Sequence, residues 1–367
     1  MDLPVLPPVD PMLAKSVPEI PAGQRYEPKW DGFRAVVFRD GDEVEIGSRN
    51  TKSIARYFPE VVASALAHLP RRCVLDGEII VPSGETTGLD FEALLQRIHP
   101  AASRVALLAR TTPALFVAFD LLALGDDDLT PRPFADRRTA LESALLGSGA
   151  RTTSSDGSAP VHVTPSTDDA QLAARWFDQF EGAGLDGVVA KRADGPYLPG
   201  KRGWSKIKHD RTADAVVAGY RVHTSGPDAI GSLLLGLYTE SGELASIGVV
   251  GAFSMDRRRE LFAELQPLRT GLEGHPWGAE LEAAAARTPR EAEASRWNRG
   301  KDLSFVPLRP ERVLEVAYDH MEGTRLRHTA QFRRWRPDRD PLSCTYDQLE
   351  EPVSFALVDV LGASSSR

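Results

Sequence analysis

Short apolar runs and two-residue alternation dominate the hydrophobic pattern of the chain, and both are typical of β-strands. Residues 74–81 and 115–124 are apolar runs suited to buried strands. Residues 34–38 and 44–48 flank Asp40-Gly41, which predicts a hairpin with a tight turn. Apolar positions with helical spacing are fewer, and they predict helices at residues 54–69, 136–146, 170–181, 257–266 and 280–287.

The pattern changes near residue 210, where short strands begin to follow one another closely. Several short strands and one helix in about 130 residues fit a small β-barrel, and the OB-fold is one such barrel. We therefore expect an α+β protein with one domain over residues 1–210, a second over 211–345 and a C-terminal tail over 346–367. Residues 147–158 predict a polar, flexible loop. The strands expected in the second half lie at 185–192, 203–208, 214–222, 232–239, 244–251, 313–320 and 326–335.

The composition is that of an ordinary globular protein, since 42% of the 367 residues are hydrophobic and 26% are charged. The sequence has no run of about 18 apolar residues that would predict a membrane span. Its first residues lack the charged and apolar regions of a secretory signal. The two cysteines, Cys73 and Cys344, fit a reducing compartment and exclude a four-cysteine zinc site made by this chain. We therefore expect a cytoplasmic protein without a membrane partner.

Charge is distributed unevenly along the chain. The net charge of −8 argues against a protein that coats nucleic acid without selectivity. Residues 191–211 and 325–339 are nevertheless rich in lysine and arginine and contain few acids. Two basic islands in an acidic chain are what a polyanion-binding groove needs. The alternative interpretation is a pair of solvated basic faces.

Residues 26–34, Tyr-Glu-Pro-Lys-Trp-Asp-Gly-Phe-Arg, carry the most informative chemistry. An uncharged lysine amine attacks phosphorus or carbonyl carbon, so Lys29 is a candidate nucleophile. Glu27 could accept a hydrogen bond from an exocyclic base amine, and Arg34 could pair with a phosphate or ribose oxygen. Taken alone, Lys29 is more often a solvated loop lysine. The motifs that follow it in the sequence argue against that interpretation.

Two acidic positions are candidates for binding a cation. Asp76-Gly77-Glu78 interrupts a run expected to be a buried strand, where unpaired acids are unfavourable. Glu78 could therefore hold the ribose of a nucleotide or a divalent ion, although a turn or a capped strand end would also explain it. Asp186 is a second carboxylate that could place Mg²⁺ on phosphates, and Gly187 beside it permits a close approach.

Four further side chains complete the constellation. Phe119 could stack on a purine, although a phenylalanine in such a run is more often core. Arg49 ends a strand and could contact phosphate or ribose, but alone it is more often a surface arginine. Alternation places Lys206 and Lys208 on one strand face, where they could neutralise a phosphate and favour an uncharged Lys29. A basic edge strand that discourages aggregation is the competing interpretation.

In this order, the motifs resemble those of ATP-dependent DNA ligases of the covalent nucleotidyltransferase superfamily, especially the short bacterial enzymes. The resemblance covers residues 8 to 345, with Lys29 as the adenylated lysine. Asp186 stands where the family usually has glutamate, which is one methylene longer, and Arg339 stands where it usually has lysine. The resemblance implies metal binding by Glu78 and Asp186, and nucleotide binding by Glu27, Arg34, Arg49, Glu78, Phe119, Lys191, Arg202, Lys206, Lys208, Arg336, Asp338 and Arg339.

The family resemblance implies an ATP-grasp-like nucleotidyltransferase domain, with antiparallel sheets and flanking helices, followed by an OB-fold domain. It implies that Lys29 takes AMP from ATP, that AMP passes to the 5′-phosphate of a nick in duplex DNA, and that the 3′-hydroxyl then displaces it. Mg²⁺, or Mn²⁺ in its place, would screen the phosphates. Arg336, Asp338 and Arg339 would reach the pyrophosphate in the first step. We expect a monomer that acts on nicked DNA in repair.

Two alternatives remain open at this point. The chain could be an RNA ligase or a GTP-dependent capping enzyme of the same superfamily, which its choice of nucleotide would reveal. It could also be a nick-binding protein that keeps the fold without turnover, although Lys29, Glu78, Lys206 and Lys208 argue against this. The sequence lacks the zinc site of NAD-dependent ligases, which argues against NAD as the nucleotide donor.

Overall fold

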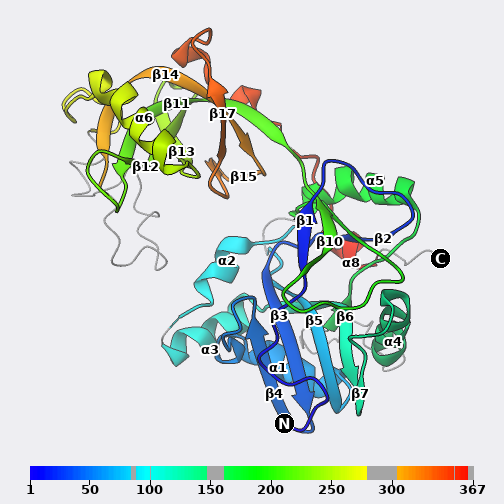
Figure 1. The fold of residues 1–367 in the computed structure, drawn as a ribbon. Coiled ribbons are helices and arrows are strands. Elements are labelled where there is room, and N and C mark those ends of the chain that lie inside the picture. Colours follow the sequence, from blue (N-terminus) through cyan, green and yellow to red (C-terminus); the bar gives the residue numbers. More distant parts are fainter. Residues whose placement is uncertain (84–87, 100, 147–160, 279–303, 351, 363–367) are drawn as a thin grey trace. The chain divides into compact units, whose positions relative to one another are not determined.

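The chain divides into two units, Met1–Lys208 with Pro352–Arg367 and His209–Glu351, each with its own hydrophobic core (Figure 1). The structure is a computed structural model that describes residues 1–83, 88–99, 101–146, 161–278, 304–350 and 352–362. The loop expected at residues 147–158 and the helix expected at 280–287 lie outside the described residues.

The larger sheet of the first unit has the order β4-β3-β5-β6-β7, and β8 pairs with β6. Alternation along β3 sends Ala35 and Val37 into a core shared with α1 and α4, while Val36 and Phe38 enter a second core on the other face. The predicted hairpin and both predicted apolar strands are confirmed. The strands are β3 (Phe33–Asp40), β4 (Glu43–Ser48), β5 (Arg72–Ile80), β6 (Leu115–Leu124), β7 (Asp127–Asp128) and β8 (Val161–Val163).

The second sheet of this unit has the order β1-β10-β9-β2. Trp204 on β10 joins the core that contains Val36 and Phe38, so the two sheets pack against each other. The expectation of antiparallel pairing holds except for two parallel pairs, β1 with β10 and β6 with β8. The strands are β1 (Leu13–Ser16), β2 (Arg25–Pro28), β9 (Val188–Lys191) and β10 (Arg202–Ile207).

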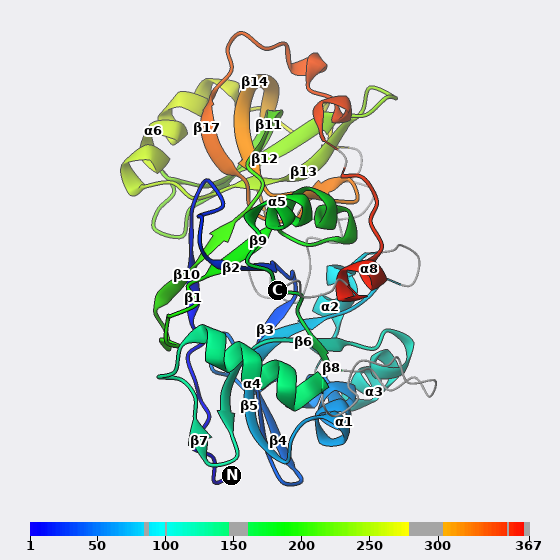
Figure 2. The same ribbon diagram turned by 90° about the vertical axis from the view of Figure 1, so that its right-hand side faces the viewer.

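Helices of the first unit agree with the predicted ones in place but not always in extent (Figure 2). The helix expected from residue 54 begins as an α-helix only at Pro59, because proline favours the first helical position. The two helices over residues 91–111 were not predicted. The helices are α1 (Pro59–His68), α2 (Phe91–Gln96), α3 (Ala102–Thr111), α4 (Phe134–Leu146) and α5 (Ala170–Gln179).

The C-terminal segment returns to the first unit. We expected a tail over residues 346–367, but helix α8 (Leu357–Gly362) buries Leu357 and Val360 there. They share a core with Trp30, which follows Lys29 in the sequence. The burial comes from two apolar positions three residues apart on one helix face, a pattern too short to predict a helix.

The second unit is built on a five-stranded sheet with the order β13-β12-β11-β14-β17. A single parallel bridge between Val250 and Ala330 joins the ends of the two edge strands, so the described residues do not form a fully paired barrel. The strand β14 starts at Val306, earlier than the expected residue 313. Its two prolines, Pro307 and Pro310, lie outside the part that pairs with β17, where a missing N–H does not interrupt that ladder. The elements are β11 (Arg211–Val222), β12 (Ile230–Tyr238), β13 (Leu244–Val250), α6 (Met255–Leu265), β14 (Val306–Tyr318), β15 (Met321–Glu322), β16 (Arg325–Leu326) and β17 (Gln331–Trp335).

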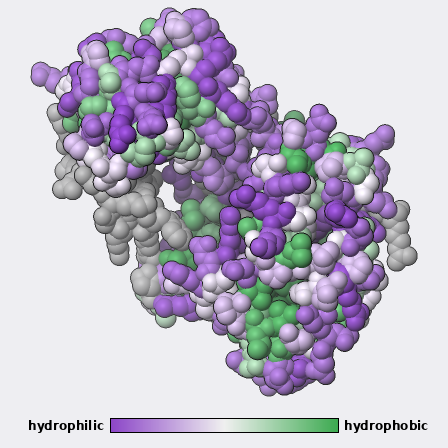
Figure 3. All heavy atoms as spheres, in the orientation of Figure 1, coloured by the Kyte–Doolittle hydropathy of each residue, from purple (hydrophilic) through white to green (hydrophobic). Residues whose placement is uncertain are grey.

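Hydrophilic residues cover most of the face in Figure 3, and apolar residues form smaller areas between them. Exposed large apolar side chains, such as Leu6, Leu107 and Val222, come from separate parts of the chain. Within the described residues, every helix is too short or too polar to cross a bilayer.

Candidate active site

Lys29 directly follows β2 and is held by backbone hydrogen bonds to the segment that leads into β9. Its N–H donates to the Gly187 carbonyl at 2.8 Å, and the N–H of Asp186 donates to the Lys29 carbonyl at 2.9 Å. Gly187 has a φ of 106°, and a Cβ there would collide with the carbonyl oxygen of Ile207. Glycine is therefore required at this position. Because it has no Cβ, the segments that contain Lys29, Gly187 and Ile207 can approach one another closely.

Asp186 pairs with two lysines through one oxygen. Its Oδ2 lies 2.5 Å from Nζ of Lys29 and 2.8 Å from Nζ of Lys208. Burial by itself would raise the pKa of Asp186, but the two ammonium groups outweigh it and hold that pKa below its usual range. The structure therefore brings Lys29, Lys208 and Asp186 together as a paired charge cluster.

Lys206 belongs to the same cluster. Burial lowers the pKa of Lys206, and the nearby charges of Lys29, Lys208 and Arg49 lower it further. Arg49 itself is exposed just after β4. Asp186 opposes this effect of the cations on Lys206, and a bound polyanion would oppose it further.

Arg34 is fixed by a buried carboxylate. Its Nε and Nη2 each lie 2.5 Å from an oxygen of Asp76, which is fully buried. The Tyr197 hydroxyl donates to Asp76 at 2.6 Å and accepts from the N–H of Met12 at 2.9 Å. Arg34, Asp76 and Glu78 lie on the sheet face that carries Val36, because alternation places every second residue of paired strands on one side.

Phe119 lies beside this network and owes its place to an irregular strand. On β6, Asp120 pairs with Asp76 but the next pair is Ala118 with Gly77, so Phe119 is the extra residue of a β-bulge. Its ring packs edge-on against Trp204 at 6.0 Å between centroids, and the Arg34 guanidinium lies 4.5 Å from its centroid. Phe119 is therefore a core residue, as one interpretation had it, and its ring also lies beside Arg34.

Glu27 is buried and already engaged by two cations. Its oxygens lie 2.6 Å from Nζ of Lys191 and 3.2 Å from Nη1 of Arg138. Burial lowers the pKa of Lys191 and raises that of Glu27, while their mutual attraction opposes both shifts. Lys191 also donates to the Phe119 carbonyl and lies 4.3 Å from the Trp204 ring.

Glu78 is the carboxyl group best suited to take up a further cation. Burial raises the pKa of Glu78 to about 7, although the charges of Arg34 and Lys29 act in the opposite direction. Its oxygens and those of Asp186 are hard donors of the kind that Mg²⁺ prefers. The described residues contain no cluster of three or more potential metal ligands. The donor set therefore fits a Mg²⁺ ion held mainly by substrate phosphates and water.

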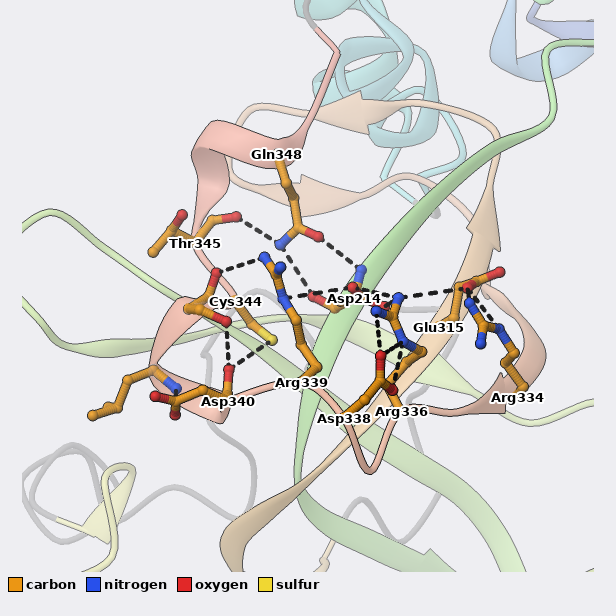
Figure 4. A network of polar contacts seen from close by, with 12 residues as sticks. Asp214, Glu315, Arg334, Arg336, Asp338, Arg339, Asp340, Cys344, Thr345 and Gln348 are labelled. Atoms are coloured by element: carbon orange, nitrogen blue, oxygen red, sulfur yellow. Dashed lines mark hydrogen bonds and ion pairs between the residues drawn. The ribbon is translucent and has the colours of Figure 1, made fainter.

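The predicted site residues of the second unit form a network of their own (Figure 4). Arg336 pairs with Asp214 and with Asp338, each at 2.9 Å. Arg339 lies 3.6 Å from Asp214 and donates to the Ser343 carbonyl. Part of the basic island at residues 325–339 is thus neutralised by acids from elsewhere in the unit.

Arg202, the remaining predicted site residue of the first unit, has an exposed side chain.

Sequence analysis missed several residues that hold this site together. Asp76 was noted only as part of an acidic interruption, and Tyr197, Trp204 and Arg138 were not singled out. Asp76 has a sequence signal, a charged residue in an otherwise apolar run, whereas the segments around Tyr197, Trp204 and Arg138 are mixed and single out none of the three. Asp214 was also missed, since its partners lie more than 120 residues away.

Two stretches of the chain match known families. Residues 11–208 match the family described as "ATP dependent DNA ligase domain", and residues 226–339 match the family described as "ATP dependent DNA ligase C terminal region". These stretches contain every predicted site residue.

Whole-chain relatives agree with these matches. The chain is 64% identical over 361 residues to "DNA ligase C" of Mycobacterium tuberculosis, covering 98% of this chain and 99% of that protein. It is 62% identical to "DNA ligase C2" of Mycolicibacterium smegmatis, covering 96% of this chain and 97% of the relative. A solved Lig E DNA ligase shares the fold, with a TM-score of 0.52, 18% identity, and coverage of 89% of this chain and 98% of that one. The chain therefore belongs to the ATP-dependent DNA ligase family.

Proposed function

We propose that Lys29 is the nucleophile by which this ATP-dependent DNA ligase takes up AMP. Nζ attacks the α-phosphorus of ATP, forms an N–P bond as the bond to the β-phosphate oxygen breaks, and pyrophosphate leaves. The amine must lose its proton for this attack. The single observation that carries the proposal is the position of Lys29 in a cluster with Lys206 and Lys208, where a phosphate would neutralise the excess charge.

The neighbouring side chains have roles in holding the nucleotide. Glu27 is held as an acceptor for the adenine amine by Lys191 and Arg138, which favours ATP over GTP as the donor. Phe119 offers a ring for base stacking. In the part of the chain that the structure describes, Nη1 of Arg34 has no hydrogen bond, so it is available to a phosphate or ribose oxygen.

Glu78 and Asp186 would hold Mg²⁺, which supplies charge neutralisation on the phosphates when bound. The chain's own contribution is positioning. Asp186 keeps Lys29 and Lys208 together, and release of Lys29 from Asp186 would accompany attack. Such transfers depend on orientation and charge neutralisation more than on bond-making side chains.

The remaining steps would join DNA. AMP passes from Lys29 to the 5′-phosphate of a nick, and the 3′-hydroxyl then attacks that phosphate and expels AMP. The exposed Arg202 and Arg49 are suited to bind the nick backbone. We propose that the enzyme acts in DNA repair, as a monomer in the cytoplasm.

The first unit is proposed to be an ATP-grasp-like adenylation domain and the second an OB-fold domain. Strand order and the parallel bridge from Val250 to Ala330 support the OB-fold, because they bring the edge strands β13 and β17 together. The helix α6 between β13 and β14 fits the same topology. Arg336, Asp338 and Arg339 would then reach the pyrophosphate of ATP from this domain.

An adduct assay tests the proposal. The purified protein is incubated with Mg²⁺ and labelled ATP, GTP or NAD, and the adduct is located by peptide mass mapping. We expect an AMP adduct from ATP alone, on the peptide that contains Lys29. The variant Lys29→Ala should form none, whereas Lys52→Ala, at an exposed lysine outside the site, should label normally. An adduct that persists in Lys29→Ala would exclude Lys29 as the nucleophile.

A further inference from the structure

Asp214 lies at the centre of the arginine network of the second unit. Both of its carboxylate oxygens accept from Nη1 of Arg336, at 3.0 and 2.9 Å. Nε of Arg339 lies 3.6 Å from the same carboxylate. Asp214 is 8% exposed, whereas the side chains of Arg336 and Arg339 are 19% and 36% exposed. The carboxylate is thus the buried member of the network.

Asp214 is also rigidly held. It lies within the β11–β14 ladder, where Glu315 is its register partner. Its N–H donates to Oε1 of Gln348 at 2.7 Å, and Nε2 of Gln348 donates back to the Asp214 carbonyl at 3.1 Å. Gln348 is itself fixed by a hydrogen bond to the Thr345 carbonyl. The carboxylate is therefore part of the framework of the unit.

Asp338, the other carboxylate that pairs with Arg336, is exposed and is not part of this framework. Asp338 has a side chain that is 62% exposed and accepts from Nε and Nη2 of Arg336. It follows Arg336 by two residues, so rotation of an exposed side chain is enough to uncover that edge of the guanidinium. Asp214 occupies only Nη1. The Nε and Nη2 edge can bind a phosphate with two parallel hydrogen bonds.

The arginines of this network stabilise the carboxylates of Asp214 and Glu315, just as these carboxylates hold the arginines in place. Asp214 and Glu315 lie opposite each other on neighbouring strands, an arrangement that is unfavourable for two carboxylates. Arg336 lies between them, 2.9 Å from Asp214 and 3.8 Å from Glu315, and Arg334 pairs with Glu315 at 2.8 Å. The pair of acids thus fixes where the arginines stand before any ligand binds.

We infer that Asp214 is a positioning residue that holds Arg336 and Arg339 in place for the phosphates of ATP. The inference rests on the proposed role of these two arginines in the first step. Asp214 does not touch the nucleotide. It orders two long side chains in advance, so that binding of the triphosphate does not have to order them.

Step-resolved kinetics of Asp214→Asn test this role. Asparagine keeps the size of the side chain and removes its charge. We expect the ATP KM of self-adenylation to rise by roughly 10-fold, the effect of one lost charged hydrogen bond. Sealing of a nick that already carries AMP should keep its rate, since that step uses no triphosphate. The matched control is Glu311→Gln, an exposed acid on β14 that pairs with Arg309, and it should change neither step.

Other outcomes are equally informative. An unchanged or lowered KM in Asp214→Asn, or a parallel loss of both steps, overturns the positioning role. If that variant does not fold, Gln348→Ala carries the test, because it keeps every charge and only frees the Asp214 backbone. It should raise the same KM by a smaller factor, and an unchanged KM contradicts the inference. Failure of the wild-type protein to form an AMP adduct would instead refute the proposed function itself.

Discussion

The ammonium group of Lys29 lies 2.5 Å from Oδ2 of Asp186, an acid 157 residues further along the chain. The same oxygen accepts from Lys208 at 2.8 Å. Asp186 therefore balances two cations while its side chain is only 6% exposed. In this arrangement Asp186 holds the side chains of Lys29 and Lys208 next to each other.

Asp186→Asn should lower the rate of self-adenylation by roughly 100-fold, as expected when a preorganised charged group is lost from a buried site. The amide cannot form the two ion pairs that hold Lys29 and Lys208, so the Lys29 side chain loses its fixed position. Asp186→Glu keeps the charge and should retain more activity than the asparagine variant. Single-turnover formation of the AMP adduct measures both. Equal rates for the two variants would show that the charge of this side chain is unimportant.

Magnesium dependence should vary with pH through Glu78. Because burial raises the pKa of Glu78 to about 7, the carboxyl is mostly protonated near pH 6 and mostly ionised near pH 8. A metal ion binds the ionised form, so its apparent affinity should rise roughly 10-fold over this interval as one proton is displaced. The measurement is the Mg²⁺ concentration that half-saturates adduct formation at fixed ATP. Glu78→Gln should remove this dependence, and a wild-type value that stays constant with pH would contradict the assignment.

Tyr197→Phe should loosen the support of Arg34. Burial raises the pKa of Tyr197 well above its usual range, so the hydroxyl stays protonated and donates to Asp76. Loss of a hydrogen bond to a buried charge should lower the free energy of unfolding by about 1.5–3 kcal/mol. Urea unfolding measures this loss of stability. We also expect the ATP KM of self-adenylation to rise in the same variant. Tyr57→Phe is the control, since no hydrogen bond of that hydroxyl occurs among the described residues, and a similar loss there would remove the argument.

Leu357→Ala should destabilise the first unit. Leu357 is 6% exposed in the core that contains Trp30, and truncation of a buried leucine costs about 2–5 kcal/mol. Val358→Ala, on the same helix at a position that is 70% exposed, should have almost no effect. Denaturant unfolding followed by tryptophan fluorescence compares the two variants. If both behave like the wild type, α8 does not contribute to this core.

Sequence alone determined much of the first unit. The residues on either side of Asp40-Gly41 predicted the hairpin of β3 and β4, and the apolar runs at residues 74–81 and 115–124 became β5 and β6. The order of charged motifs from Lys29 to Arg339 predicted the family. These features are readable because strand periodicity and residue chemistry are local properties of the chain.

Only the tertiary structure decided which charges meet. Asp186 faces Lys29, Asp76 holds Arg34, and Asp214 takes up part of a cationic island that looked free in the sequence. It also decided that the C-terminal residues return to the core beside Trp30. Such pairings are set by strand register and by packing between segments far apart in the chain. A local pattern can therefore predict that an acid will be buried, but it does not predict which lysine or arginine will pair with that acid.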